Sequence, residues 1–305
     1  MNPEATPTAS APIEAESTAP TESSEIRRLS AAALDVESRI GLEPAPRTAY
    51  RSGPWLVAAA LLTAGLFGVL ALLPSSRWVE MFTQRGPVPY VVMLLSFWAA
   101  LCLLVKLEKI GVQRRALAVR DLVPREPDFV LSPGTAGRVL DRLSARCVDP
   151  HRFLLFDRIS FALSNLKNMG RVGDVDDALH ARADADADAA ESSYTLLRGL
   201  VWAIPVLGFI GTVQGLSVSL GAFGGVIQES ADFEALKPAL RDVTGGLATA
   251  FDTTLLALVA ALIVQMLLTL TRKREEELLD ACQAYCLTHL VGKLRLNPFE
   301  AERRA

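Results

Sequence analysis

The chain has 305 residues, of which 50% are hydrophobic and 21% are charged. Its mean hydropathy of +0.29 is high for a soluble globular protein, so the composition predicts a membrane protein. The formal net charge of -3 gives no reason to expect nucleic-acid binding, and the sequence has no Walker loop, HExxH or GxSxG motif. Composition and motifs therefore argue against a nucleic-acid-binding protein and against an enzyme.

The N-terminal region differs in composition from the rest of the chain. Residues 1–26 are rich in Pro, Ala, Ser, Thr and Glu and contain almost no large apolar side chains. Such a segment cannot bury enough surface to fold, and it lacks the basic and apolar stretches of a cleaved signal peptide. We therefore expect residues 1–50 to form a disordered or weakly structured cytoplasmic tail.

Four apolar runs are long enough to cross a membrane. The first, residues 55–73, contains no charged residue and would extend for about 28 Å as a helix, which matches the hydrocarbon core. With residues 88–105 it would form a transmembrane hairpin over residues 54–106. The third and fourth expected spans are residues 199–223 and 246–270. The sequence thus predicts an all-α polytopic membrane protein with four transmembrane helices.

Basic residues gather before the first span, after the second and after the fourth. The residues concerned are Arg27, Arg28, Arg39, Arg47, Arg51, Lys106, Lys109, Arg114, Arg115, Arg120, Arg272, Lys273 and Arg274. Because such residues concentrate on the cytoplasmic side, both termini and the segment between spans two and three are expected in the cytoplasm. We therefore expect a multi-pass protein of the bacterial inner membrane.

The segment between spans two and three, residues 107–197, has helical rather than strand periodicity. We expect it to form a helical cytoplasmic insert. Near its end, Asp184, Asp186 and Asp188 alternate along the chain and therefore cannot share one helix face. This spacing favours a solvated helix surface over a cation site.

The segment after the fourth span, residues 276–305, carries one apolar stripe that includes Cys282 and Cys286. The stripe predicts a cytoplasmic C-terminal helix that continues until Asn297 and Pro298 stop it. No second Cys or His pair is found elsewhere at metal-ligand spacing, so the two cysteines are expected to pack in a core rather than to bind a metal.

Small residues recur along one face of the third span. Gly211, Gly215 and Ser219 are four residues apart, and Gly208 lies just before them. Such a face lets another helix backbone approach closely.

Hydroxyl groups are expected at similar depths on the last two spans. Because these spans are antiparallel, Thr212 on the third lies near the height of Thr253 and Thr254 on the fourth. Hydroxyls at one level could line a hydrated proton path, or accept a hydrogen bond from a carboxylic acid of another subunit. The neighbouring Asp252 is a candidate because a carboxylate inside a membrane is costly, although a hydrated residue near the surface is the other interpretation.

Residues 194–275 resemble the core of the MotA/TolQ/ExbB proton-channel family. The resemblance is carried by the pattern P-x-x-G-x-x-G-T-V-x-G, from Pro205 to Gly215, and by the segment GLATAFDTTLLALVAALIVQML that follows. The first motif is similar to the TolQ and ExbB branch, whereas four spans are similar to MotA. By this resemblance residues 198–275 form the channel core.

The resemblance implies functional roles for individual residues. Thr212 and Thr254 match the two threonines that line the lumen in the family, with Thr253 beside them. Asp252 lies one turn beyond Thr249, where the Tol and Exb branch usually has Glu, and is the candidate replacement for that acid.

The resemblance also implies an assembly and a function. Five copies would surround a dimer of a single-span partner of the MotB/TolR/ExbD type, whose membrane Asp carries ions through the lumen of the ring. The complex would need no cofactor, would conduct protons or else Na+, and would convert the ion-motive force into mechanical work. The alternative is a membrane-anchored scaffold or signalling protein that acts through its cytoplasmic helical domain.

Overall fold

The computed structural model describes most of the chain after its N-terminal region. The described residues are 35–41, 45, 47–74, 77–83, 86–119, 122–123, 129–169, 171–229 and 233–295. Within these ranges the regular elements are helices. One isolated β-bridge pairs Leu131 with Leu294. Four helical segments are long and apolar enough to cross a membrane. The predicted all-α fold with four transmembrane helices is confirmed.

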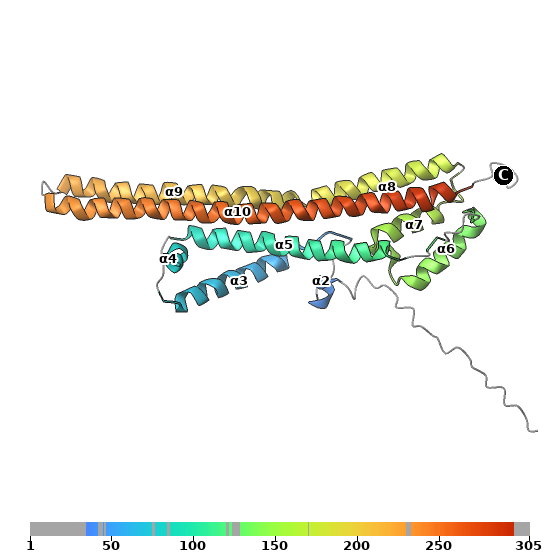
Figure 1. Cartoon of the computed structure of the whole chain (residues 1–305), viewed down its shortest axis with the longest axis horizontal. Helices are drawn as coiled ribbons and strands as arrows, with labels where there is room; N and C mark the ends of the chain where they lie inside the picture. Colours follow the sequence, from blue (N-terminus) through green and yellow to red (C-terminus); the bar gives the residue numbers. More distant parts are fainter. Residues whose placement is uncertain are drawn as a thin grey trace, which may run out of the picture.

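Two helix pairs form the membrane bundle (Figure 1). The pair α9 (Thr195–Glu229) and α10 (Phe233–His289) runs antiparallel and side by side. Helix α5 (Val88–Leu117) packs against both of them, and α3 (Ser52–Leu72) packs on α5, with the short α4 (Arg77–Thr83) between these two in the chain. The pair α9 and α10 therefore forms one side of the bundle.

Two hydroxyl side chains in the first two spans form hydrogen bonds within their own helices. The Thr63 hydroxyl of α3 donates a hydrogen bond to the Ala59 carbonyl at 2.8 Å, and the Ser96 hydroxyl of α5 donates to the Val92 carbonyl at 2.6 Å. Such bonds allow hydroxyl side chains to lie in an apolar environment without an outside partner. Neither hydroxyl therefore needs a partner from another helix.

A helical region follows α5 in the chain. It contains α6 (Pro133–Arg146), the short η1 (Pro150–Arg152), α7 (Leu154–Ser164) and α8 (Val172–Ser192). At the start of α6, the side chain of Thr135 accepts a hydrogen bond from the backbone N–H of Ser132 at 2.8 Å, as in a capping box. The buried Gln113 of α5 accepts the first free N–H of α7, from Leu154, at 3.0 Å.

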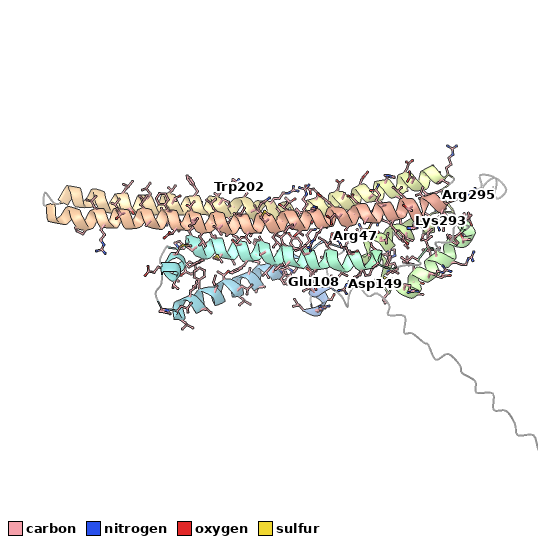
Figure 2. All side chains as sticks on the ribbon, in the orientation of Figure 1. Arg47, Glu108, Asp149, Trp202, Lys293 and Arg295 are labelled. Carbon is pink, nitrogen blue, oxygen red and sulfur yellow. The ribbon has the colours of Figure 1, made fainter. Side chains whose placement is uncertain are left out.

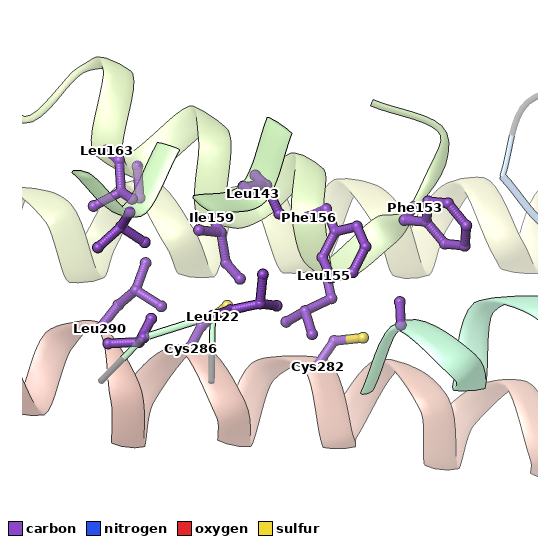
Figure 3. Packing of buried hydrophobic residues seen from close by; sticks show 14 of the residues in the cluster. Leu122, Leu143, Phe153, Leu155, Phe156, Ile159, Leu163, Cys282, Cys286 and Leu290 are labelled. Carbon is purple, nitrogen blue, oxygen red and sulfur yellow. The ribbon is translucent and has the colours of Figure 1, made fainter. Parts of the chain in front are cut away.

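An apolar core joins this region to the end of α10 (Figure 3). This core contains Phe153, directly before α7, and Phe156 and Ile159 of α7, together with Cys282 and Cys286 of α10. Both cysteines are buried free thiols. The prediction that they pack in a core is confirmed.

The C-terminal helix is shorter than predicted. Helix α10 ends at His289 and is followed by the 3-10 turn η2 (Val291–Lys293), well before Asn297. The chain leaves the helix because it pairs with Leu131: the Leu131 N–H donates to the Lys293 carbonyl at 2.8 Å, and the Arg295 N–H donates to the Leu131 carbonyl at 2.9 Å. Residues 296–305, including Asn297 and Pro298, lie outside the described residues.

The described part of the N-terminal region is packed against the helices. It contains the short α2 (Val36–Arg39), capped by Asp35, and the fully buried side chain of Glu37. Within the segment that was expected to be weakly structured, the described residues 35–41, 45 and 47–50 thus include a short helix and buried side chains. Composition could not predict this packing because it depends on ion pairs with distant residues. Residues 1–34 lie outside the described part of the chain.

Candidate functional site

The small residues of α9 form its contact with α10. A Cβ atom added to Gly208 would lie 2.5 Å from the Cβ of Ala257, and one added to Gly211 would lie 2.8 Å from the Thr253 hydroxyl. At Gly215 the Cβ would lie 3.3 Å from the Cβ of Ala250. No side chain fits at the first two positions without a shift, so the glycines set the close approach of the two backbones.

The contact between α9 and α10 continues through Ser219 toward the C-terminal end of α9. Its hydroxyl donates to the Gly215 carbonyl at 2.9 Å, and its side chain fills the space that a Cβ on Gly246 would occupy. Pro205 lies within α9 before Gly208, whereas Ser219 follows Gly215. The three glycines and Ser219 therefore serve a contact within one copy of the chain.

The three candidate threonines differ in position. Thr253 is only 2% exposed, faces Gly211 and donates to the Ala250 carbonyl at 2.9 Å. Thr254 is half-buried and donates across the contact to the Gly208 carbonyl at 2.9 Å. Thr212 is half-buried and donates to the Phe209 carbonyl at 2.6 Å. Because it is enclosed in the contact, Thr253 belongs to helix packing rather than to a surface that an ion could reach.

Thr212 and Thr254 lie on the same edge of the contact, which we call the threonine rim. Gly211 and Thr253 face each other, and each next residue is turned by about 100° around its helix. Because the helices are antiparallel, this turn moves both Thr212 and Thr254 toward one edge. That edge is opposite α5, whose Val88 lies against Gly211.

Apolar side chains with large exposed areas flank the threonine rim. They include Phe209, which is 67% exposed on α9, and Phe251, which is 63% exposed on α10. Trp202, further along α9, is 72% exposed and projects away from α5 (Figure 2). An apolar surface with two hydroxyl groups in its centre suits a neighbouring helix better than water.

Asp252 does not share a face with Thr254. The two residues are two positions apart on a continuous α-helix, so their side chains diverge by about 160°. The half-buried Asp252 side chain therefore points away from the threonine rim within one copy. Within one copy of the chain, Asp252 therefore does not share the edge on which Thr212 and Thr254 lie. Thr249 is the position one turn before Asp252 where the resemblance led us to expect Glu. Its side chain is not among the described side chains.

A buried ion pair lies at the opposite end of the bundle from Val88. The Lys106 ammonium of α5 donates to Glu275 of α10 at 3.0 Å and to the Ser193 hydroxyl at 2.7 Å, and lies 4.4 Å from the centre of the Tyr194 ring. Ser193 and Tyr194 form the turn between α8 and α9. The ion pair and its neighbours thus join α5, α10 and the turn between α8 and α9.

A second ion pair fixes the N-terminal segment. Glu37 accepts hydrogen bonds from the Lys109 ammonium at 2.6 Å and from the backbone N–H groups of Ala45 and Arg51 at 2.8 and 3.0 Å. Burial alone would raise the pKa of Glu37, but these hydrogen bonds and the charge of Lys109 hold it below the ordinary value. Glu37 therefore stays ionised in the folded protein at neutral pH.

A third cluster links the N-terminal segment to α7 and α8. Arg47 binds Asp157 of α7 at 2.8 Å and also binds Asp186 of α8, whose other oxygen accepts from Arg158 at 2.9 Å. Arg182 also donates to Asp157. Burial would raise the pKa of Asp157, but hydrogen bonds from His151 and Arg182 and the charge of Arg47 lower it.

Sequence reasoning missed these ion pairs. It placed Asp186 on a solvated surface with Asp184 and Asp188, and this is wrong for Asp186, which is 4% exposed, although the other two are exposed. Lys106 and Lys109 appeared only as basic residues beyond a span. The one available signal was Lys106 directly at the end of an apolar run, where a long side chain can turn back toward the bundle.

One comparison with known proteins identifies a related family. Residues 156–284 match the model of a family described as the MotA/TolQ/ExbB proton channel family. The matched segment runs from α7 into the last part of α10 and contains the threonine rim, the small residues and Glu275. No curated protein and no solved structure matches the chain significantly.

Proposed function

We propose, from the match of residues 156–284 to the model of the MotA/TolQ/ExbB proton channel family, that this chain is the multi-pass subunit of an ion-driven motor. Members of this family are channel and transport subunits that work in complexes, not enzymes. The subunit would conduct protons together with a single-span partner and convert the flux into mechanical work.

The threonine rim is the observation that carries this proposal. Two hydroxyl groups on antiparallel helices lie at one edge of the α9–α10 contact, within an exposed apolar surface. Both hydroxyls donate to backbone carbonyls, so their oxygens can still accept a hydrogen bond from outside the chain. A protonated carboxyl group on a partner helix would be such a donor.

The ring proposed from the family resemblance suits this surface. In a homopentamer each copy would turn its threonine rim toward a central lumen that holds a dimer of the partner. Among the described residues of the four spans, Asp252 is the only carboxylate, and it points away from the rim. We therefore assign the ion-carrying acid to the partner, as a membrane Asp, and place Asp252 outside the lumen.

The charge distribution supports an orientation in the membrane. Lys106, Lys109 and Arg272 lie at the end of the bundle that joins the helical region of α6 to α8. We propose that this end is cytoplasmic, together with both termini, and that the protein resides in the bacterial inner membrane.

The test uses the native complex, purified from membranes through a tag on this chain and reconstituted into vesicles. We expect Thr212→Val and Thr254→Val each to reduce proton uptake under an imposed potential by about tenfold, because an acceptor for the carried proton is lost. The matched control is Thr63→Val, which removes a back-bonded hydroxyl from α3. Uptake at the wild-type rate in both rim variants, with the complex intact, would contradict the proposal.

A scaffold or signalling role is the second candidate. It is favoured by the apolar core around Phe156, which is distinct from the apolar core between the membrane helices. Replacing residues 199–223 and 246–270 by unrelated Leu-rich helices discriminates between the two roles. A scaffold would retain its function after this replacement, whereas a channel subunit would lose it.

A further inference from the structure

Arg158 on α7 is a buried cation with unused hydrogen-bond donors. Its side chain is 1% exposed, and its Nε donates to Asp186 at 2.9 Å. Within the part of the chain that the structure describes, neither terminal amino group, Nη1 or Nη2, has a hydrogen-bond partner. Leaving such donors unpaired in an apolar interior is costly, so a ligand that accepts from them would be stabilising.

The neighbouring carboxylates have no free oxygen for these donors. Asp186 binds Arg47 through one oxygen and Arg158 Nε through the other. Asp157 binds His151 through one oxygen, and Arg47 and Arg182 through the other. The cluster therefore contains three guanidinium groups and two carboxylates, and the surplus positive charge lies at the most deeply buried arginine.

A cavity lies next to Arg158, between α7, α8 and α10. It is lined by Arg158, Leu179, His180, Gln283, Cys286 and Leu287 and has an empty volume of about 200 Å³, part of it open to solvent. Its enclosed part has room for about one water-sized particle. Apart from Arg158, the lining offers the Gln283 amide and the His180 ring as further polar groups, and no carboxylate.

We propose that this cavity binds a small monatomic anion of the size of chloride, held by the terminal amino groups of Arg158. An anion accepts hydrogen bonds from both donors and also balances the surplus positive charge. A water molecule can accept hydrogen bonds but cannot balance the charge. The positive charge of Arg158 excludes a metal cation, and the small enclosed volume excludes polyatomic anions such as phosphate. The bound anion would tie α7, α8 and α10 together, at a site separate from the threonine rim.

The experiment measures thermal unfolding of the full chain in detergent in sodium chloride, sodium bromide or sodium gluconate at equal ionic strength. We expect the melting temperature to be higher in chloride or bromide than in gluconate. It should rise by about 2 °C for each tenfold increase in chloride above the dissociation constant. Equal melting temperatures in chloride and gluconate would overturn the proposal and leave water as the occupant.

Two conservative variants localise the effect. Arg158→Lys keeps a cation beside Asp186 but removes the forked amino groups, so the chloride response should disappear. Arg182→Lys is the matched control in the same charge cluster; it does not line the cavity and should keep the response. A full response in Arg158→Lys would refute the site.

A second measurement covers the case in which Arg158→Lys does not fold. The line width of chloride-35 NMR in the presence of wild-type protein should exceed that of buffer, and bromide should remove the excess. No excess broadening would rule out a bound chloride.

Discussion

The two ends of this helix bundle are held together by different interactions. Around the threonine rim, α9 and α10 approach through Gly208, Gly211 and Gly215, and hydroxyl groups donate to backbone carbonyls. At the other end, charged side chains such as Lys106 and Glu275 are buried together between helices. The first kind of contact suits an apolar surrounding and leaves the outer surface of the helix pair free for other helices.

The two kinds of contact leave different surfaces exposed. A contact between small residues has a fixed backbone distance, and the side chains beside it, such as Phe209 and Phe251, remain exposed. Buried ion pairs join segments that are far apart in the chain and resist displacement, because separating the charges is costly. We infer that the charged end holds the helical region and the membrane helices together, away from the threonine rim that we propose as the surface for the partner.

Removing the buried ion pair between Lys106 and Glu275 should have the largest effect on stability. We expect Lys106→Met to reduce the free energy of unfolding by about 3–5 kcal/mol, because Glu275 is left as a buried charge without its cation. Thermal unfolding in detergent measures this. The double variant Lys106→Met, Glu275→Leu should recover most of the loss, since both charges are removed. A double variant as unstable as the single one would show that the ion pair does not explain the effect.

Breaking the close contact should have an intermediate effect. We expect Gly208→Ala to reduce the free energy of unfolding by about 1–3 kcal/mol, since the new methyl group would overlap that of Ala257. Adding Ala257→Gly should restore part of the loss. The control Gly68→Ala in α3, where a Cβ meets no atom within 4 Å, should be neutral or stabilising by up to about 1 kcal/mol. Equal effects at both glycines would contradict a special contact.

The sequence allowed the apolar end to be predicted well. Each span is a continuous apolar run, and this local property was enough to place four membrane helices. The spacing of Gly211, Gly215 and Ser219 predicted a close helix contact, because residues four apart share a helix face. The sequence alone did not indicate which helix would meet that face, or that Thr253 would be enclosed by it.

The charged end could not be predicted from local patterns. Lys106 and Glu275 are 169 positions apart, and Lys109 and Glu37 are 72 apart. An ion pair at such separation has no spacing rule, so each residue by itself looked like a solvated charge. Asp186 illustrates this: it has the same neighbours in sequence as the exposed Asp184, yet Arg47 and Arg158 enclose it.

Acid should weaken the charged end before the apolar one, and this is the smallest effect that we expect. The pKa of Glu37 is lowered below its ordinary value of 4.5, so its contribution to stability is present above pH 4.5. The contribution is lost as the pH falls from there through the lowered pKa, because protonation breaks the bond to Lys109. Asp157, whose pKa is also lowered, acts in the same direction.

The variant Glu37→Gln tests the contribution of this one carboxylate. Its melting temperature at pH 7 should be lower than that of the wild type, and the two should converge as the pH falls below 4.5, since the wild type loses a charge that the variant never had. Glu108→Gln is the matched control, because that residue is half exposed and lies 3.9 Å from Arg39 in a solvated pair. A difference between wild type and Glu37→Gln that stays constant from pH 7 to pH 3 would mean that the residue acts through packing. The bond to Lys109 would then contribute little to holding the N-terminal segment against α5.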